Sequence, residues 1–480
     1  MKEFLKTVDR KILNPETRLK GITYAYMVFA GLLLLHHIYV IIYHKEILTG
    51  AAVFYIPFII LAGVNFFMGR LWKDKLFYVF LLLFILKVVR TAIIDEYAVE
   101  VSVTYFVLSV YAFFGCYGIA RVIPRNQWKN FLSVLCFIWT AASVVFAAFG
   151  LKAAFTGVPI PNLGTEAFFI RDDHRLCLLH HPVSSGVILS TCMSFAVFGC
   201  FLTKKRILKL YYTAAALVLF FTASLTGTRT AFILSGVNIG LLLYIPLRDL
   251  LKPGIPKSLI KTGGKYAVIV LTVLASALLV AWVQSKAANI MKFAQIRGTL
   301  LISNAYAEGN PVLPEIYERG FDYSGGTDVL LNGRITIWEN VLEVAFANLE
   351  NALMGVSVYN TMVPLYELRA ERGLYYVYHC HNTFLQHLLE NGIPALLLYC
   401  CFVFTVIYHA VRVMINRSLP FWQRIIPVTS LICLLEGLGD NTCHVNFGYP
   451  QMTLLYLFAG FTVALSGKMI NKGGQSGESA

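Results

Sequence analysis

Apolar runs of membrane-spanning length follow one another along most of this 480-residue chain and restrict what it can fold into. A helix needs roughly 20 apolar residues to cross a bilayer. Only 14% of the residues are charged, against about 25% in soluble domains. We therefore predict an all-α membrane protein with about twelve transmembrane helices, at residues 21–43, 50–69, 76–94, 101–120, 131–151, 183–202, 209–226, 230–246, 265–285, 393–411, 425–439 and 449–467.

The net charge of +14 would suit a nucleic-acid-binding protein, but its distribution indicates a membrane topology instead. Lysine and arginine gather in residues 1–20 and in the connections after every second apolar run, whereas the intervening short connections are poor in them. This positive-inside pattern predicts that both termini are cytoplasmic. We expect no nucleic-acid partner, and the ten cysteines, most of them in apolar runs, show no disulfide pattern.

Two longer connections, residues 152–182 and 286–392, fall on the outer side and set the predicted domain organisation. We expect a large, partly helical extracytoplasmic loop between the ninth and tenth spans. The predicted parts are an interfacial cytoplasmic helix at 1–20, a membrane domain with nine spans at 21–285, the extracytoplasmic loop at 286–392, a membrane domain with three spans at 393–467 and a cytoplasmic tail at 468–480.

A histidine-containing segment, residues 378–392, leads into the tenth apolar run. His381 heads a pattern of apolar residues at i+3, i+4 and i+7, which predicts that it shares one face of a short helix. Asn391-Gly392 is expected to end that helix. His381 would then lie at the outer end of a span, where a group that titrates near neutral pH can take a proton. A purely interfacial histidine is the alternative explanation.

Several cations are predicted to lie near the outer membrane boundary: Lys87 and Arg90 in the third run, Arg175 and the pair His180-His181 before the sixth, Arg229 between the seventh and eighth, and Arg334 at the head of an amphipathic helix in the large loop. Each alone could be an interface anchor. The four arginines around one histidine, His381, suit a diphosphate, because guanidinium groups bind phosphate oxygens in a bidentate way. Glu436 and Asp440, near the end of the eleventh run, could pair with some of them.

Three motifs resemble the O-antigen ligase and O-antigen polymerase superfamily of bacterial membrane glycosyltransferases. They are Thr226-Gly227-Thr228-Arg229, then Asn332-Gly333-Arg334 with Trp338, and then His381-Asn382 with Leu385 and Gly392. His181-Pro182-Val183 is a weaker match, since many members have asparagine before the proline. The resemblance covers roughly residues 160–400.

The resemblance implies an enzyme for surface polysaccharide (O-antigen, capsule or exopolysaccharide) in the bacterial cytoplasmic membrane, with its active site on the outer side. Its donor would be a glycan on undecaprenyl diphosphate, and its acceptor a sugar hydroxyl of a glycan or lipid-linked glycan. His381 would act as the base, and Arg229 and Arg334 would stabilise the diphosphate. The substrate would also be bound by Arg175, His181, Asn382, Arg90 and Trp338. No metal or other cofactor is expected, and ligase and polymerase activities both fit.

A transporter or glycolipid flippase is the alternative from another functional class. Twelve spans with both ends inside would suit one. However, two-halved transporters tend to show internal repeats, and this chain shows none. The position of the long outer loop, between the ninth and tenth runs, also argues against two equal halves.

Overall fold

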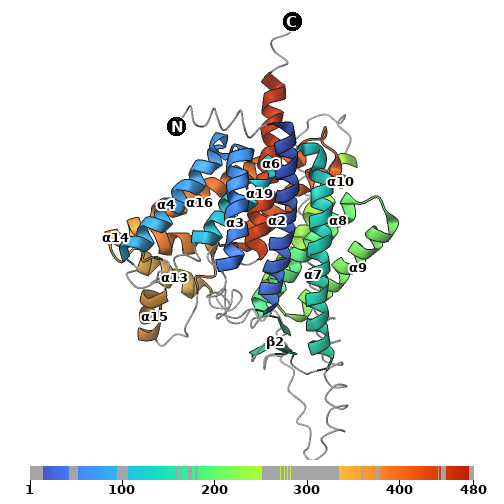
Figure 1. Ribbon diagram of the computed structural model, residues 1–480. Coiled ribbons are helices and arrows are strands. Elements are labelled where there is room, and N and C mark those ends of the chain that lie inside the picture. Colours follow the sequence, from blue (N-terminus) through green and yellow to red (C-terminus); the bar gives the residue numbers. More distant parts are fainter. Residues whose placement is uncertain are drawn as a thin grey trace, which may run out of the picture.

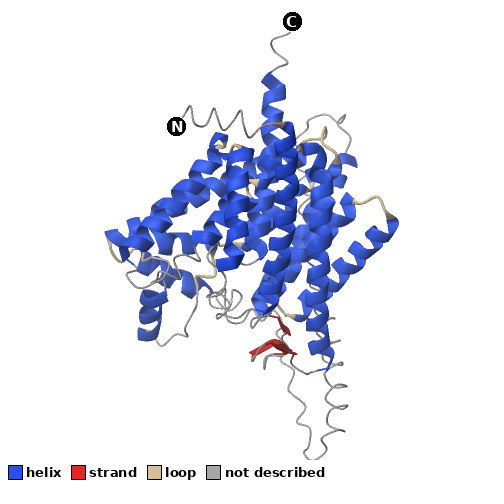
Figure 2. Ribbon diagram, viewed as in Figure 1, coloured by secondary structure: helices blue, strands red, loops and turns tan. Residues whose placement is uncertain are grey.

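The computed structural model describes residues 14–42, 52–94, 106–156, 160–162, 165–170, 176–178, 182–250, 334–357, 362–372, 379–441, 443–444 and 450–474, with four isolated positions between 271 and 282. Within these residues the chain is almost entirely helical, as Figures 1 and 2 show. The long helices are α2 (Pro15–Ile42), α3 (Ala52–Gly69), α4 (Lys75–Ile94), α7 (Trp128–Thr156), α8 (Pro182–Leu202), α9 (Arg206–Leu225), α10 (Arg229–Leu250), α16 (Thr383–Ile415) and α19 (Pro450–Gly474).

Shorter helices complete the architecture: α6 (Ile119–Val122), α13 (Arg334–Ala345), α14 (Leu349–Met354), α15 (Met362–Glu371), α17 (Phe421–Arg424) and α18 (Ile426–Glu436). A π-helical turn, Tyr111–Cys116, precedes α6. Helices α13 and α15 lie at the lower end of Figure 1, whereas the C-terminal end of α19 lies at the upper end.

Every predicted apolar run except 265–285, most of which lies outside the described residues, overlaps a described helix. In the described part, four helices are long and apolar enough to cross a membrane: Arg125–Thr156, Ser185–Leu202, Arg206–Leu225 and Thr383–Ile415. Four shorter apolar helices are Pro57–Gly69, Phe106–Val122, Ile233–Ile245 and Gln451–Gly467. The helical class is thus confirmed, while the count of twelve spans stays a prediction.

Two details differ from the predicted pattern. The residues of the predicted interfacial helix from Pro15 onward belong to α2, with the proline at the first helical position, where its missing N–H costs nothing; residues 1–13 lie outside the described part. The connection 152–182 also contains a small antiparallel sheet of β1 (Ile160–Asn162), β2 (Thr165–Ile170) and β3 (Leu176–Leu178). The aromatic and β-branched residues of β2 favour an extended chain.

The core of the helical bundle surrounds α19, which stands at the centre of Figure 1. Its side chains are buried at every position from residue 451 to 463. A helix that is apolar all round is stable only when other helices cover it on every side. Helices α16 and α18 pack against α19, so the segments that begin and end these two helices are held in fixed positions relative to each other.

Helix α16 is broken near its start, as the Asn391-Gly392 pair predicts. Gly392 has φ 73° and ψ −172°, and Pro394 follows without an N–H. The carbonyls of Leu389 and Glu390 are left without helical partners by this break. They accept hydrogen bonds from the N–H groups of Val356 (2.8 Å) and Ser357 (3.1 Å) instead. The break therefore joins the end of α14 to α16.

Gly392→Ala is expected to destabilise the fold by roughly 1–3 kcal/mol from backbone strain alone. A Cβ at this residue would also overlap the carbonyl of Leu353. Thermal unfolding of the purified protein in detergent measures the loss. The matched control is Gly63→Ala in α3, where a Cβ meets nothing within 4 Å. Equal unfolding temperatures for the two variants would show that the fold does not need glycine at residue 392.

Candidate active site

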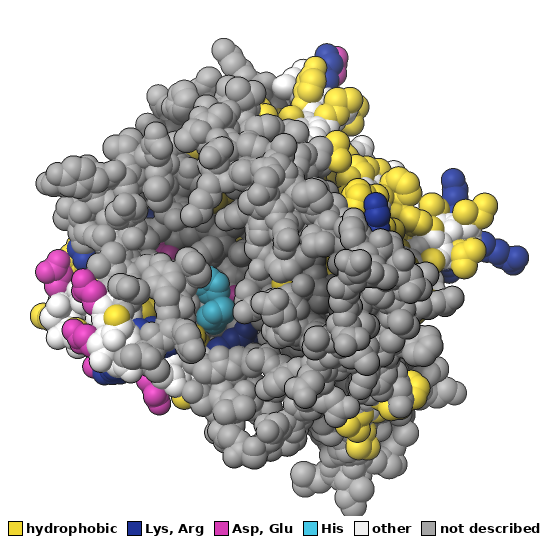
Figure 3. Space-filling model, turned by 90° about the horizontal axis from the view of Figure 1, so that it is seen from below, with side chains coloured by type: hydrophobic (Ala, Val, Ile, Leu, Met, Phe, Trp, Pro, Cys, Tyr) yellow, Lys and Arg dark blue, Asp and Glu magenta, His cyan; other side chains and the backbone are white. Residues whose placement is uncertain are grey.

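Four segments of the chain meet at the end of the molecule that carries α13. They are the start of α10, the start of α13, the residues that lead into α16, and residues 437–441 after α18. Arg334 donates from Nη1 to Thr230 Oγ1 at 3.2 Å, and the Thr383 N–H donates to the Gly437 carbonyl at 2.8 Å. Figure 3, viewed from this end, shows histidine side chains in a hollow with Lys and Arg side chains beside them.

His381 precedes α16 instead of lying within it. Its backbone is in the left-handed region with φ 50°. Helix α16 starts after Asn382, whose Oδ1 accepts the N–H groups of Phe384 (2.9 Å) and Leu385 (3.2 Å). The prediction that His381 shares a helical face with the apolar residues is therefore wrong, because asparagine is a preferred N-cap and sets the helix start beyond it. Backbone strain of this kind clusters at functional sites.

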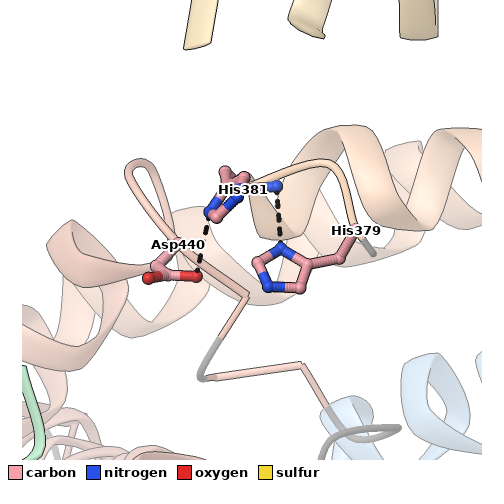
Figure 4. A group of neighbouring side chains, drawn as sticks. All are labelled: His379, His381 and Asp440. Atoms are coloured by element: carbon pink, nitrogen blue, oxygen red, sulfur yellow. Dashed lines mark hydrogen bonds and ion pairs between the residues drawn. The ribbon is translucent and has the colours of Figure 1, made fainter. Parts of the chain in front are cut away.

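His379 lies beside His381, although helical spacing would place the two residues on different sides. Their ring centroids are 4.0 Å apart, and the His381 N–H donates to His379 Nδ1 at 3.3 Å, as Figure 4 shows. Residues two apart in a helix would be rotated by roughly 200° about its axis. The left-handed turn at His381 brings the two imidazoles together instead.

Asp440 faces His381 from the segment after α18 (Figure 4). Its Oδ1 lies 3.6 Å from His381 Nδ1, and 4% of the Asp440 side chain and 22% of the His381 side chain are exposed. A carboxylate beside Nδ1 favours the tautomer with the proton on Nδ1. Nε2 of His381 is then the nitrogen with a lone pair, which is the atom that a general base needs.

The surroundings of Asp440 keep its carboxylate ionised. Burial alone would raise the pKa of Asp440, but the contact with His381 and the nearby His379 and Arg334 outweigh burial and hold the pKa well below its usual range. Burial lowers the pKa of Arg334, and the charge of Asp440 partly offsets this. The guanidinium still stays charged at any physiological pH.

Arg334 is a buried cation beside this pair, not a side chain that reaches out to water. It is 8% exposed, and a Cβ at Gly439 would lie 3.4 Å from its Nη1. Its charge also acts on Asp440. The head of α13 therefore places a guanidinium next to the histidine and carboxylate. An arginine that only reached out to water would be exposed instead.

Asn382 and Trp338, both predicted to bind substrate, have partners within the protein. Asn382 caps α16 and donates from Nδ2 to the Leu438 carbonyl at 3.1 Å. Trp338 donates from Nε1 to the Cys380 carbonyl at 3.1 Å. The first contact connects the histidine segment to the residues before Asp440, and the second connects it to α13. Both side chains thus hold the site together.

Arg90 lies at the crossing of α14 and α16. Its Nη2 donates to the Gly355 carbonyl, and its Nη1 is 3.5 Å from Glu350 Oε1. Both contacts join α4, which carries Arg90, to α14. The predicted role of Arg90 in binding substrate stays a prediction, and the described contacts give it a structural role.

The remaining predicted site residues are Arg229, Arg175 and His181. Arg229 is the first residue of α10, after a turn in which Gly227 has φ 61°. Arg229 immediately precedes Thr230, whose Oγ1 accepts a hydrogen bond from Arg334. The side chain of Arg229, and all of Arg175 and His181, lie outside the described part of the structure.

Within the described residues, His379, His381 and Asp440 also form a group that could ligate a metal ion. Their nitrogen and oxygen atoms all lie within 4.8 Å of one another. Two imidazoles and a carboxylate are common zinc ligands. The sequence predicted no metal, and the same three groups suit proton transfer, so chelation is included in the experiment proposed below.

Asp440 and His379 are site residues that sequence reasoning did not select. A signal for Asp440 existed, since a carboxylate at the end of an apolar run is costly unless it has a function or a partner. The sequence indicates Asp440 as a partner for cations or as a substitute base, but not as the partner of His381. For His379 the local pattern gave the wrong helix start, so no signal in that pattern placed it beside His381.

These features define a multi-pass helical membrane protein with an arginine and a histidine–aspartate pair at one end of the bundle. A family model described as O-Antigen ligase matches residues 213–400, from α9 to the start of the long part of α16. The matched stretch contains Arg229, Arg334 and His381, and the match confirms the resemblance to the O-antigen ligase and polymerase superfamily. No curated protein matches the chain.

Asp440→Asn is expected to lower the rate of glycan transfer by about 10- to 100-fold, as loss of an orienting partner does. The amide removes the charge and can present N–H₂ to His381 Nδ1, which favours the wrong tautomer. Initial rates at saturating donor measure the effect. An unchanged rate would rule out an orienting role for Asp440.

The same substitution should change how stability depends on pH. The pKa of Asp440 is depressed in the folded protein, so its ionised form stabilises the fold above the unfolded value of about 3.9. This stabilisation is lost as the pH falls towards the folded value. The difference in unfolding temperature between wild type and Asp440→Asn should therefore be constant above about pH 5 and shrink below about pH 4.

Proposed function

We propose that the protein transfers a glycan from undecaprenyl diphosphate to a sugar hydroxyl at the outer face of the bacterial cytoplasmic membrane. The acceptor would be another glycan or a lipid-linked glycan, and the product a surface polysaccharide. The observation that carries the proposal is the arrangement of Arg334 next to the His381–Asp440 pair. It supplies a base for the acceptor and a positive charge for the leaving diphosphate in one site.

His381 is the proposed general base. Its Nε2 takes the proton of the acceptor hydroxyl while that oxygen forms a bond to the anomeric carbon of the donor. The bond between the anomeric carbon and the diphosphate oxygen breaks, and its electron pair stays on the diphosphate. Asp440 holds the Nδ1 proton and stabilises the imidazolium that forms.

Arg334 and Arg229 are proposed to stabilise the charge that grows on the diphosphate. A guanidinium in a buried site acts through a lower effective dielectric than in water, and it needs no reorganisation during the reaction. Arg229 is the residue before Thr230, and Arg334 donates a hydrogen bond to Thr230. Two arginines could thus bind neighbouring phosphate oxygens, and this supports a mechanism without a metal ion.

Membranes that contain the protein, a lipid-diphosphate glycan and an acceptor test the proposal. The expected result is release of free lipid diphosphate together with a lengthened or ligated glycan, and loss of both with His381→Ala. Addition of EDTA should leave the rate unchanged. Movement of intact donor across the membrane without release of lipid diphosphate would favour a flippase. Loss of activity in EDTA that zinc restores would assign His379, His381 and Asp440 to a metal site.

The orientation of the protein in the membrane is inferred from the basic connections and is also a proposal. Reporter fusions near Gly325 and Gly254, both outside the described residues, check it. The fusion near Gly325 is expected to report the outer side, and that near Gly254 the cytoplasm. Reversed signals would place the candidate site on the cytoplasmic side and would exclude a donor in the outer leaflet.

A further inference from the structure

One amide oxygen lies between the two chain segments that carry the His381–Asp440 pair. Gln386 Oε1, from the first turn of α16, accepts the N–H of Cys380 at 3.2 Å. It also accepts Nδ2 of Asn441 at 2.7 Å. Cys380 precedes His381, and Asn441 follows Asp440. A single side chain is therefore bonded to the neighbours of both members of the pair.

The orientation of the Gln386 amide is fixed by Glu390, one helical turn further on. Gln386 Nε2 donates to Glu390 Oε1 at 2.8 Å. With a carboxylate on its nitrogen and two donors on its oxygen, the amide has one favourable orientation. Gln386 is 2% exposed and Asn441 1%. The network is thus internal to the protein, and a substrate does not reach it.

Glu390 lies among further buried ionisable groups. Its Oε2 is 3.4 Å from His444 Nε2, and it interacts electrostatically with Lys87 of α4. Burial, together with the neighbouring His387 and Lys87, holds the pKa of His444 well below its ordinary value. A buried carboxylate is tolerated only with such partners. The charge of Lys87, which the sequence left without a role, therefore supports Glu390.

We propose that Gln386, oriented by Glu390, is a positioning residue that sets the distance between His381 and Asp440. Backbone hydrogen bonds fix residues 437–440 to the end of α18, whereas Gln386 bonds to Cys380 and to Asn441, the residues next to the pair. A shift of about 1 Å in such a pair can cost up to 10²-fold in rate. The proposal rests on the proposed function, because it assigns Gln386 a role in proton transfer by His381.

The test uses the full-length protein in the transfer assay with Gln386→Leu, Asn441→Ala and a matched control. Both variants are expected to lower kcat by roughly 10- to 100-fold, with KM for the donor unchanged because the arginines still bind the diphosphate. The control is Gln451→Leu in α19, where a fully buried glutamine has no hydrogen-bond partner among the described residues. It should transfer glycan at the wild-type rate.

A combined variant separates positioning from a general structural role. In an Asp440→Asn background, Gln386→Leu should cause little further loss of kcat, because the pair that Gln386 positions is already broken. Full additivity of the two losses would overturn the proposal. If Gln386→Leu does not accumulate in the membrane, Asn441→Ala gives the same comparison, since it removes only the contact on the Asp440 side.

His381→Ala in the same assay separates the two proposals. If it is inactive while Gln386→Leu and Asn441→Ala transfer at the wild-type rate, the positioning role is wrong and the proposed function stands. If wild type itself releases no lipid diphosphate, or if His381→Ala is fully active, the proposed function is wrong.

Discussion

His381→Ala is expected to lower the rate of glycan transfer by ~10² to 10⁴-fold, the usual contribution of a general base. Donor binding should be largely kept, because the arginines hold the diphosphate. His381→Gln should be no more active, since an amide can form hydrogen bonds but cannot take a proton near neutral pH. Single-turnover rates with a saturating donor measure the effect, and a donor-binding assay reports the retained affinity.

Two other histidines serve as references for this experiment. His379→Ala should have a smaller but measurable effect, because His379 accepts the His381 N–H and packs on its ring. His409→Ala, near the far end of α16, should leave transfer unchanged. An active His381→Gln, or a larger loss from His379→Ala than from His381→Ala, would show that the proton is taken elsewhere.

Arg334→Lys is expected to lose most transfer activity, by about 10² to 10³-fold, as removal of one preorganised donor to a developing charge does. Lysine keeps the charge but lacks the planar fork that binds two phosphate oxygens. The variant should accumulate in the membrane at the wild-type level. Transfer rates at several donor concentrations distinguish a loss in kcat from a loss in donor affinity.

Arg372→Lys is the matched control for this arginine. Arg372 pairs with Glu343 of α13 at 2.7 Å on a partly exposed surface. Exposed ion pairs of this kind contribute little, so transfer should be close to the wild-type rate. Near-normal transfer by Arg334→Lys as well would mean that the charge of Arg334 is sufficient and that the diphosphate is not bound in a bidentate way.

Local sequence patterns determined the helical class and the break in α16. Apolar runs indicate helices because each run carries the information within about twenty residues. The Asn391-Gly392 pair followed by Pro394 likewise predicts where the helix breaks, since backbone strain and a missing N–H are local properties. The motifs around Arg229, Arg334 and His381 are also short stretches of sequence, so they could be selected without the structure.

The small sheet and the histidine segment before α16 show where local patterns were insufficient. The segment 160–178 has no helical or strand periodicity long enough to predict β1, β2 and β3, which pair only after the chain folds back on itself. Asn382 caps α16 with help from Leu438, more than fifty residues later. The helix start follows from the local cap by Asn382, whereas the position of the histidine segment depends on this contact with a distant segment.

The sequence by itself determined that this protein is a helical membrane protein with an arginine and a histidine on the same predicted outer loop. Only the tertiary structure decided that Asp440 faces His381 and that Gln386 connects the segments on both sides of them. These residues come from parts of the chain that meet because α16 and α18 pack against α19. Hydropathy and helical spacing describe each segment separately, whereas the packing of buried side chains fixes which segments meet.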